Sequence, residues 1–259
     1  MSKTALITGA SVGIGYELAL LMAKDKYNLV IVARSEDKLQ ALKEKLEQEC
    51  GIKVWVIAED LSKENAAQIV FDKVINEGLE IDVLVNNAGF GDFGKFAETD
   101  WEKEARMMQL NMIALTHFTK LFAKGMVARG SGKIMNVAST ASYQPIPYFA
   151  VYAASKAYVL SFSEAIAYEL RETGVTVTAL CPGATDTEFA KAASMENSSI
   201  FKGGLPTGKD VAEFGYRKMN SGATTAIHGL KNYILANSNR FAPRKMSTAI
   251  SGWMVSRNT

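Results

Sequence analysis

Short apolar runs alternate with longer, helix-like stretches along the chain. The runs typical of β-strands lie at residues 5–8, 29–33, 54–58, 83–85, 134–137 and 175–180. Most of them are continuously apolar, which is typical of strands buried on both faces of a parallel sheet. The segments between them are long enough for crossover helices. The pattern therefore predicts an α/β fold in which a doubly wound parallel sheet carries helices on both faces.

No linker rich in Pro, Gly or Ser and no internal repeat divides the chain, so we expect residues 1–259 to form a single domain. The charge-dense stretch 35–49 keeps Leu39, Leu42 and Leu46 at helical spacing and is interpreted as a solvated helix. After the sixth run the alternation weakens. Residues 184–206 are rich in Ala, Ser and Gly, and we expect a mobile loop over a ligand site.

The end of the chain, residues 240–257, is predicted to be a helical extension. Its large apolar residues Met246, Ile250, Trp253 and Met254 have spacings compatible with one helical face, with basic residues beside them. Our main interpretation is that this face packs against the body of the protein or against another subunit. Contact with a membrane surface is the alternative.

Composition and charge limit the partners, metal sites and compartment that we expect for this protein. The 259 residues are 48% hydrophobic and 22% charged, which is typical of a globular protein. With 29 Lys and Arg against 27 Asp and Glu and no long basic block, the charge gives no reason to expect nucleic acid or an anionic membrane as the main partner. Cys50 and Cys181 are too few for a disulfide framework or a cysteine-based zinc site, so we expect a reducing compartment and no metal. Glycines and prolines interrupt the two segments that resemble targeting or transmembrane signals, and we expect a cytoplasmic protein.

A glycine-rich turn follows the first predicted strand and opens a helical pattern. It has the order Gly-x-x-x-Gly-x-Gly, and its candidate ligand-binding residues are Thr8, Gly9, Ser11, Gly13, Ile14 and Gly15. Such a turn lets backbone amides and the positive end of a helix dipole approach a pyrophosphate. The alternative is a tight strand–helix turn without a ligand.

The second predicted strand ends at Arg34 and Ser35, where a site for NAD usually carries an acidic residue. Arg34 cannot accept hydrogen bonds from ribose hydroxyls, but its guanidinium can bind a 2′-phosphate. We therefore expect NADP(H) as the cofactor, with Ser35 and Lys38 as further contacts. An exposed charge at the start of a helix is the alternative interpretation of Arg34.

Tyr152 and Lys156 are the most specific candidates for chemistry. They are four residues apart at the start of a helical pattern, so they lie on one helix face. There the ammonium group is expected to lower the pKa of the phenol from its usual value of about 10, which would make the tyrosine a usable acid. A buried tyrosine beside an exposed lysine is the alternative.

The motifs together resemble those of the short-chain dehydrogenase/reductase family. The resemblance covers residues 8–187 and rests on the glycine-rich turn, Asp60, Asn86 to Gly89, Asn111, Ser139, Tyr152, Lys156, Pro182, Gly183 and Thr187, in family order. It implies a Rossmann-like sheet of about seven strands. It also implies that Ser139 binds the substrate oxygen, that Tyr152 transfers a proton and that Lys156 holds the nicotinamide ribose. Asn111 would interrupt its helix and position a water in a proton relay.

The same resemblance assigns the remaining cofactor contacts. Asp60 and Leu61 would bind the adenine, and Asn87, Ala88 and Gly89 would form the wall beside the adenosine. The nicotinamide end would be bound by Pro182, Gly183, Thr185 and Thr187, together with Tyr152 and Lys156. Some of these positions also have an interpretation without a ligand: Asp60 as an exposed loop aspartate, and Pro182 as part of a simple Pro-Gly turn.

The expected activity is that of an NADP(H)-dependent oxidoreductase that interconverts a carbonyl compound and an alcohol. Apolar residues from segments that could border the pocket suggest an apolar substrate: Phe90, Phe93, Phe96, Tyr143, Ile146, Tyr148, Phe149, Phe189 and Phe201. The resemblance also implies a homo-oligomer, a dimer or tetramer. A cofactor-binding regulatory or scaffold protein with little turnover is the alternative function.

Overall fold

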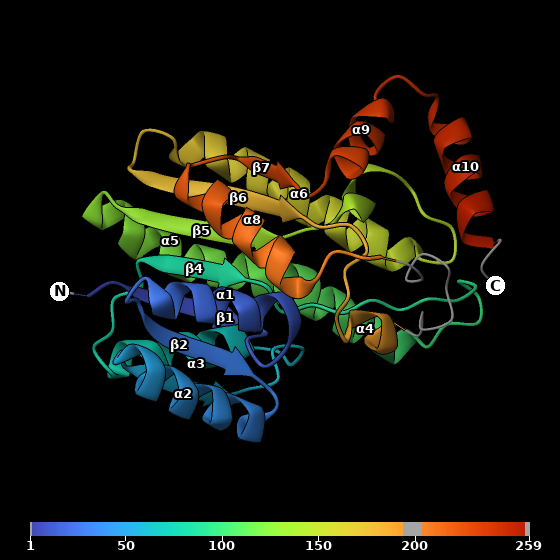
Figure 1. The fold of residues 1–259 in the computed structure, drawn as a ribbon. Helices are drawn as coiled ribbons and strands as arrows, with labels where there is room; N and C mark the ends of the chain where they lie inside the picture. Colours follow the sequence, from blue (N-terminus) through green and yellow to red (C-terminus); the bar gives the residue numbers. More distant parts are fainter. Residues whose placement is uncertain (1, 194–203, 257–259) are drawn as a thin grey trace.

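A seven-stranded parallel sheet forms the centre of the computed structural model, which describes residues 2–193 and 204–256 (Figure 1). The strands follow the order β3-β2-β1-β4-β5-β6-β7. Their bounds are β1 Thr4–Thr8, β2 Asn28–Ala33, β3 Val54–Ala58, β4 Val83–Asn86, β5 Gly132–Val137, β6 Val175–Cys181 and β7 Thr225–Ile227. The predicted doubly wound α/β fold is confirmed. The three-residue strand β7 was not among the six apolar runs, because it is too short to stand out.

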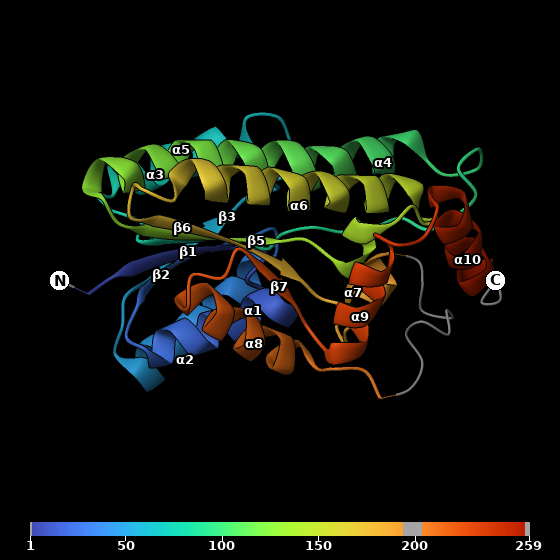
Figure 2. The ribbon, with the colours of Figure 1, turned by 90° about the horizontal axis from the view of Figure 1, so that it is seen from above.

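Helices cover both faces of the sheet (Figure 2). One layer holds α1 Gly13–Lys24, α2 Glu36–Cys50 and α8 Gly208–Asn220, and the other holds α3 Ala66–Asn76, α5 Leu115–Arg129 and α6 Ala150–Leu170. Each layer buries its own apolar cluster against the sheet. Leu39, Leu42 and Leu46 of α2 are buried as the helical spacing predicted. Two buried faces explain why the strands are continuously apolar.

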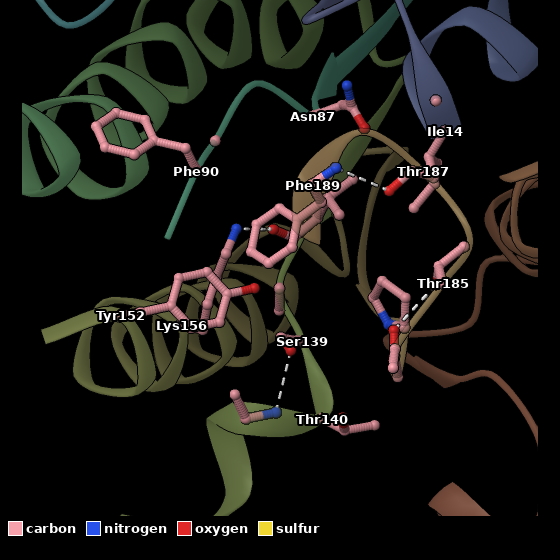
Figure 3. A pocket seen from close by; sticks show the side chains of 18 of the residues that line it. Ile14, Asn87, Phe90, Ser139, Thr140, Tyr152, Lys156, Thr185, Thr187 and Phe189 are labelled. Carbon is pink, nitrogen blue, oxygen red and sulfur yellow. Dashed lines mark hydrogen bonds between the residues drawn. The ribbon is translucent and has the colours of Figure 1, made fainter. Parts of the chain in front are cut away.

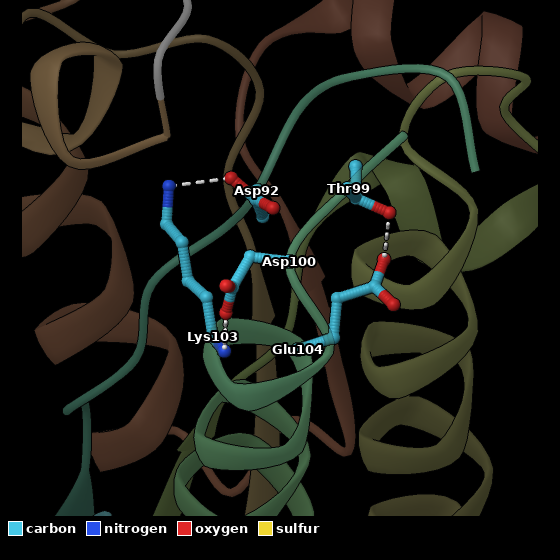
Figure 4. A network of polar contacts seen from close by, with 5 residues as sticks. All are labelled: Asp92, Thr99, Asp100, Lys103 and Glu104. Atoms are coloured by element: carbon cyan, nitrogen blue, oxygen red, sulfur yellow. Dashed lines mark hydrogen bonds and ion pairs between the residues drawn. The ribbon is translucent and has the colours of Figure 1, made fainter. Parts of the chain in front are cut away.

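The segment after β4 is fixed to the start of α4 Trp101–Met108 by polar side chains (Figure 4). Asp100 caps α4 by accepting a hydrogen bond from the backbone N–H of Lys103 at 2.7 Å. The Lys103 ammonium forms an ion pair with the carboxylate of Asp92. The Thr99 hydroxyl donates to the Glu104 carboxylate at 3.0 Å. These contacts hold the loop that runs past the carboxyl end of β4.

Three further helices lie beyond the carboxyl ends of the strands: α7 Phe189–Ala192, α9 Leu230–Ser238 and α10 Arg244–Ser256 (Figure 1). The predicted loop 184–206 falls partly outside the described residues, since 194–203 are not described. Its described part contains α7, and Asp186 forms a β-bridge with Thr207, the residue directly after the predicted loop. No helix in the described ranges combines the length and the apolar character needed to cross a membrane.

Helix α10 lies within the predicted extension. Of the two partners expected for its large apolar residues, the body of the protein is wrong, and another subunit stays a prediction. Met246, Ile250, Trp253 and Met254 are 42–55% exposed. Small residues face the body instead: Ser251 is buried and donates a hydrogen bond to the carbonyl of Pro145 at 2.6 Å. Small side chains let the helix approach the loop before α6 closely, which large side chains would prevent.

Candidate active site

The glycine-rich turn and the end of β4 are locked together at the centre of the sheet. The side-chain amide of Asn87 donates to the carbonyls of Thr8 (2.9 Å) and Gly9 (3.1 Å). Gly9 has φ +67°, and a Cβ atom there would lie 2.8 Å from that amide, so only glycine suits this position. A Cβ atom on Gly15 would lie even closer, at 2.4 Å. The glycines therefore shape a turn whose backbone stays open to the pocket.

Thr8 supports this arrangement from the end of β1. Its hydroxyl accepts hydrogen bonds from the backbone N–H groups of Asn87 and Ala88, both at 3.0 Å, and donates to the carbonyl of Val85 at 3.3 Å. Helix α1 begins at Gly13, so its amino-terminal end lies at the same place. Free amides and the helix dipole make this end favourable for a bound anion.

The carboxyl ends of β2 and β3 place Arg34 and Asp60 on the rim of the same pocket. Asp60 accepts hydrogen bonds from the hydroxyl (2.7 Å) and backbone N–H (3.0 Å) of Ser62. Partial burial acts to raise the pKa of Asp60, but the Ser62 hydrogen bonds and the charge of Arg34 outweigh it and the pKa is lowered. Lys38 does not line the pocket; its ammonium lies 3.6 Å from the Glu188 carboxylate.

Tyr152, Ser139 and Lys156 meet at the opposite end of the pocket, where Figure 3 shows their side chains around one space. Ser139 follows β5 and accepts a hydrogen bond from the backbone N–H of Ala141 at 3.1 Å. The Lys156 ammonium donates to the carbonyl of Val137 at 2.7 Å and lies 5.9 Å from the centre of the Tyr152 ring. The hydrogen bond fixes Lys156 close to the tyrosine of the same helix.

Burial shifts the pKa values of both Tyr152 and Lys156. It raises the pKa of Tyr152 to about 12, against the opposing effect of a hydrogen bond with Ser139. The prediction that the pKa of this phenol is lowered is therefore wrong for the structure as it stands. The physical reason is the stacked ring of Phe149, at 4.2 Å between centroids, with Phe189 at 5.4 Å, because these rings exclude water. Burial also lowers the pKa of Lys156 to about 8.

Asn111 lies behind the pocket and does not line it. It is buried in a π-helical segment, Gln109–Ala114, which interrupts the α-helix between α4 and α5. Its side-chain amide donates to the carbonyl of Phe90 (3.0 Å) and to the Ser155 hydroxyl (3.1 Å), and its oxygen accepts from the N–H of Phe90 (3.3 Å). Asn111 thus connects the loop after β4 with the helix that carries Tyr152 and Lys156.

One pocket of about 1080 Å³ brings most of the predicted residues together. Its lining includes Gly9, Ser11, Gly13, Ile14, Arg34, Ser35, Asp60, Leu61, Asn87, Ala88, Gly89, Ser139, Tyr152, Lys156, Pro182, Gly183, Thr185 and Thr187. Thr8, Gly15, Lys38 and Asn111 are the predicted site residues outside this lining. Thr8, Gly15 and Asn111 contact or adjoin lining residues, so they position the site rather than form its surface.

The apolar end of the pocket was predicted only in part. Phe90, Ile146, Phe149 and Phe189 line it, while Phe93, Phe96, Tyr143 and Tyr148 do not, and Phe201 lies outside the described residues. The sequence reasoning missed the contribution of α9, of the residue that follows it and of α10: Leu230, Lys231, Asn232, Leu235, Ala236, Asn239, Ser251, Met254 and Val255. No motif marks these positions, because the chain folds back over the pocket only after the last strand.

Comparison with known proteins supports the same assignment. Residues 3–198 match the family model described as short chain dehydrogenase. A 17-beta-hydroxysteroid dehydrogenase type 3 of Mus musculus is 34% identical over 74% of this chain and 63% of its own length. A very-long-chain 3-oxoacyl-CoA reductase of Pyrenophora tritici-repentis is 37% identical over 67% of this chain and 52% of its own length. The chain thus spans about half to two thirds of these two relatives.

The fold agrees with the sequence match. A solved short-chain dehydrogenase from Sphingobium yanoikuyae, in complex with NADPH, superposes with a TM-score of 0.83 at 30% identity and covers 92% of this chain and 94% of its own. The parallel sheet, the glycine-rich turn and the matched residues all indicate one family. The chain belongs to the short-chain dehydrogenase family of oxidoreductases, which bind a nicotinamide cofactor.

Proposed function

We propose that this protein is an NADP(H)-dependent reductase of apolar carbonyl compounds, with Tyr152 as the proton donor. The observation that carries the proposal is the meeting of Tyr152, Ser139 and Lys156 in one pocket with the amino-terminal end of α1. A dinucleotide and a substrate need a site that is large enough for both, and the pocket of about 1080 Å³ is at the upper end of ordinary ligand sites.

The residues present fit such a cofactor. The backbone from Gly9 to Ile14 lines the pocket and would hold the pyrophosphate at the start of α1. Arg34 and Ser35 would bind the 2′-phosphate, and this contact is our reason for favouring NADP(H) over NAD(H). When bound, the nicotinamide ring supplies or accepts the hydride that accompanies the proton.

Tyr152 and Ser139 would act on the substrate oxygen. Since its pKa is about 12, the phenol of Tyr152 is protonated at neutral pH and has a proton to donate. The Ser139 hydroxyl would donate a hydrogen bond to the same oxygen as negative charge develops on it. The charge of Lys156, held near the ring by the carbonyl of Val137, would stabilise the phenolate that remains.

The apolar end of the pocket supports the class of substrate. Phe149 and Phe189 pack against Tyr152, and the apolar side chains of Leu235 and Met254 line the same pocket. The two relatives are named for the reduction or oxidation of steroid and very long acyl substrates, both largely apolar. We therefore propose a hydrophobic ketone or oxoacyl compound, whose carbonyl would point to Tyr152 and whose apolar part would lie against α9 and α10.

Substitution of Tyr152 by Phe tests the proposal. Loss of a general acid lowers turnover by roughly 10²- to 10⁴-fold, while binding of NADPH, measured by fluorescence titration, should change little. Tyr168→Phe is the matched control, because this tyrosine is exposed on α6 far along the helix from Tyr152. NADPH oxidation would be followed with a panel of hydrophobic ketones. If Tyr152→Phe retains wild-type turnover, the assigned acid is wrong; a wild type that binds NADPH but reduces nothing would favour the regulatory alternative.

A further inference from the structure

Helices α9 and α10 and the turn between them expose an unusual number of large apolar side chains. We call this set the α9–α10 surface; its apolar members are Leu230, Tyr233, Ile234, Phe241, Met246, Ile250 and Trp253. Phe241, in the turn, is 90% exposed. In Figure 1 the two helices form a projecting pair beyond the carboxyl ends of the strands. Large apolar side chains exposed together in one part of a fold usually mark a contact with another molecule or with a membrane.

The carboxyl-terminal part of the chain, which contains α9 and α10, carries basic side chains and no acidic ones. Residues 214–259 contain seven Lys and Arg and no Asp or Glu, so residues 1–213 together carry a net charge of −5 although the whole chain has +2. Lys231, Arg240, Arg244 and Lys245 are the basic residues of the α9–α10 surface, and all four are exposed. Large apolar side chains with basic neighbours are the pattern by which amphipathic helices bind anionic lipid.

A second copy of the chain fits this surface less well. In a symmetric dimer formed through α9 and α10, the same basic residues would face one another across a partly apolar contact. Like charges brought together in this way oppose association. An anionic surface instead attracts the basic residues while the apolar side chains leave water, so both features act in the same direction.

We propose that the α9–α10 surface docks the protein on the surface of an anionic membrane. The 13 residues of α10 are about 20 Å long, less than the roughly 30 Å hydrocarbon core, so the helix would lie in the interface rather than cross the bilayer. Phe241, Met246 and Ile250 would enter the interface, and Arg244 and Lys245 would contact lipid phosphates or carboxylates.

Docking in this way would place the pocket beside the lipid. Leu235 of α9 and Met254 and Val255 of α10 line the pocket, and so do Leu230 and Lys231 of the α9–α10 surface itself. An apolar substrate would then travel a short path from bilayer to pocket. Membrane docking itself rests on exposure and charge and does not depend on the proposed reductase activity.

Flotation of the full-length protein with vesicles tests the proposal without an activity assay. With vesicles of phosphatidylcholine and phosphatidylserine in a 7:3 ratio, the wild type should float; with phosphatidylcholine alone it should remain largely at the bottom. The triple variant Phe241→Ser, Met246→Ser, Ile250→Ser should lose flotation. The pair Arg244→Gln, Lys245→Gln should partition roughly 25-fold more weakly, because each basic residue near an anionic surface contributes about fivefold.

Matched controls use exposed residues outside α9 and α10. The apolar control is Phe96→Ser, Trp101→Ser, Ile113→Ser, and the charge control is Lys120→Gln, Lys124→Gln; both should float like the wild type. A wild type that fails to float with the anionic vesicles, or a triple variant that floats as well as its control, overturns the proposal. A triple variant that changes the oligomeric state in sedimentation velocity, without vesicle binding by the wild type, would assign this surface to a contact between copies.

Discussion

At the residue scale, Tyr152 shows how the folded environment changes a prediction made from spacing. Lys156 follows Tyr152 by four positions, and this spacing predicted a phenol made more acidic by its neighbour. In the folded protein Phe149 and Phe189 surround the ring, and desolvation dominates its pKa. A phenol that stays protonated suits the direction of reduction, where the tyrosine gives up a proton.

Lys156 offers a test at this scale, since it is a buried cation whose pKa is about 8 instead of about 10.5. Between these two pH values the unfolded chain binds more protons than the native protein, so this residue makes stability rise with pH. Relative to Lys156→Met, the free energy of unfolding of the wild type should therefore increase by about 3 kcal/mol from below pH 8 to above pH 10. Urea denaturation of both proteins across this range would measure it; a constant difference would show that the lysine is neutral or solvated throughout.

Arg34 supports a second test, of cofactor choice. Arg34→Asp would remove the proposed charge-assisted contact to a 2′-phosphate and introduce an acceptor for ribose hydroxyls. Because such contacts contribute about 1.5–3 kcal/mol, the ratio of kcat/KM for NADPH over NADH should fall roughly 10- to 100-fold. Lys38→Ala is the control, since Lys38 does not line the pocket and its ammonium lies 3.6 Å from the Glu188 carboxylate. An unchanged ratio in Arg34→Asp would mean that another group recognises the phosphate.

At the scale of elements, the close packing of α10 connects the end of the chain to the substrate pocket. Gly252 faces Pro147, and a Cβ atom there would lie 3.0 Å from the proline ring. Ser251, beside it, is hydrogen-bonded to Pro145 and lines the pocket. A larger side chain at position 252 must therefore move the helix, and with it one wall of the pocket.

Gly252→Leu should loosen α10 at a cost of about 1–3 kcal/mol, the usual cost of overpacking. Amide hydrogen exchange in α10 should become faster, and KM for an apolar ketone should rise more than kcat falls. Ala249→Leu, an exposed position of the same helix, provides the control. If amide hydrogen exchange in α10 is equally fast in both variants, the contact between Gly252 and Pro147 does not hold α10 in place.

At the scale of the whole molecule, the pocket joins residues that follow every strand from β1 to β7. A ligand that bridges these segments stabilises the native state by mass action, by about 2.7 kcal/mol at a concentration of 100 Kd. For a chain of this size that corresponds to a rise in Tm of roughly 5–10 °C. NADPH should produce this rise at a lower concentration than NADH, as measured by differential scanning fluorimetry. Equal shifts at equal concentrations would contradict the proposed preference.

Local sequence was sufficient to predict six of the strands and the order of the motifs. Continuously apolar runs identify six of the seven strands, because burial on both faces leaves little freedom of composition. The glycine-rich turn and the residues after the strands lie at the carboxyl ends of the sheet, because parallel strands bring these ends to one edge. Most of the predicted site residues meet in one pocket for this reason.

Other features depend on contacts between distant segments, and only the tertiary structure decided them. The burial that sets the acidity of Tyr152 comes from Phe149 and Phe189, and no spacing along the chain reports it. Likewise, Ser251 and Val255 face the body, and Met246 and Ile250 do not. The reason is that α10 packs against the loop at Pro145, which lies 106 residues before Ser251 in the sequence. Hydrophobic periodicity shows that a helix has an apolar face, but the partner surface determines which face is buried.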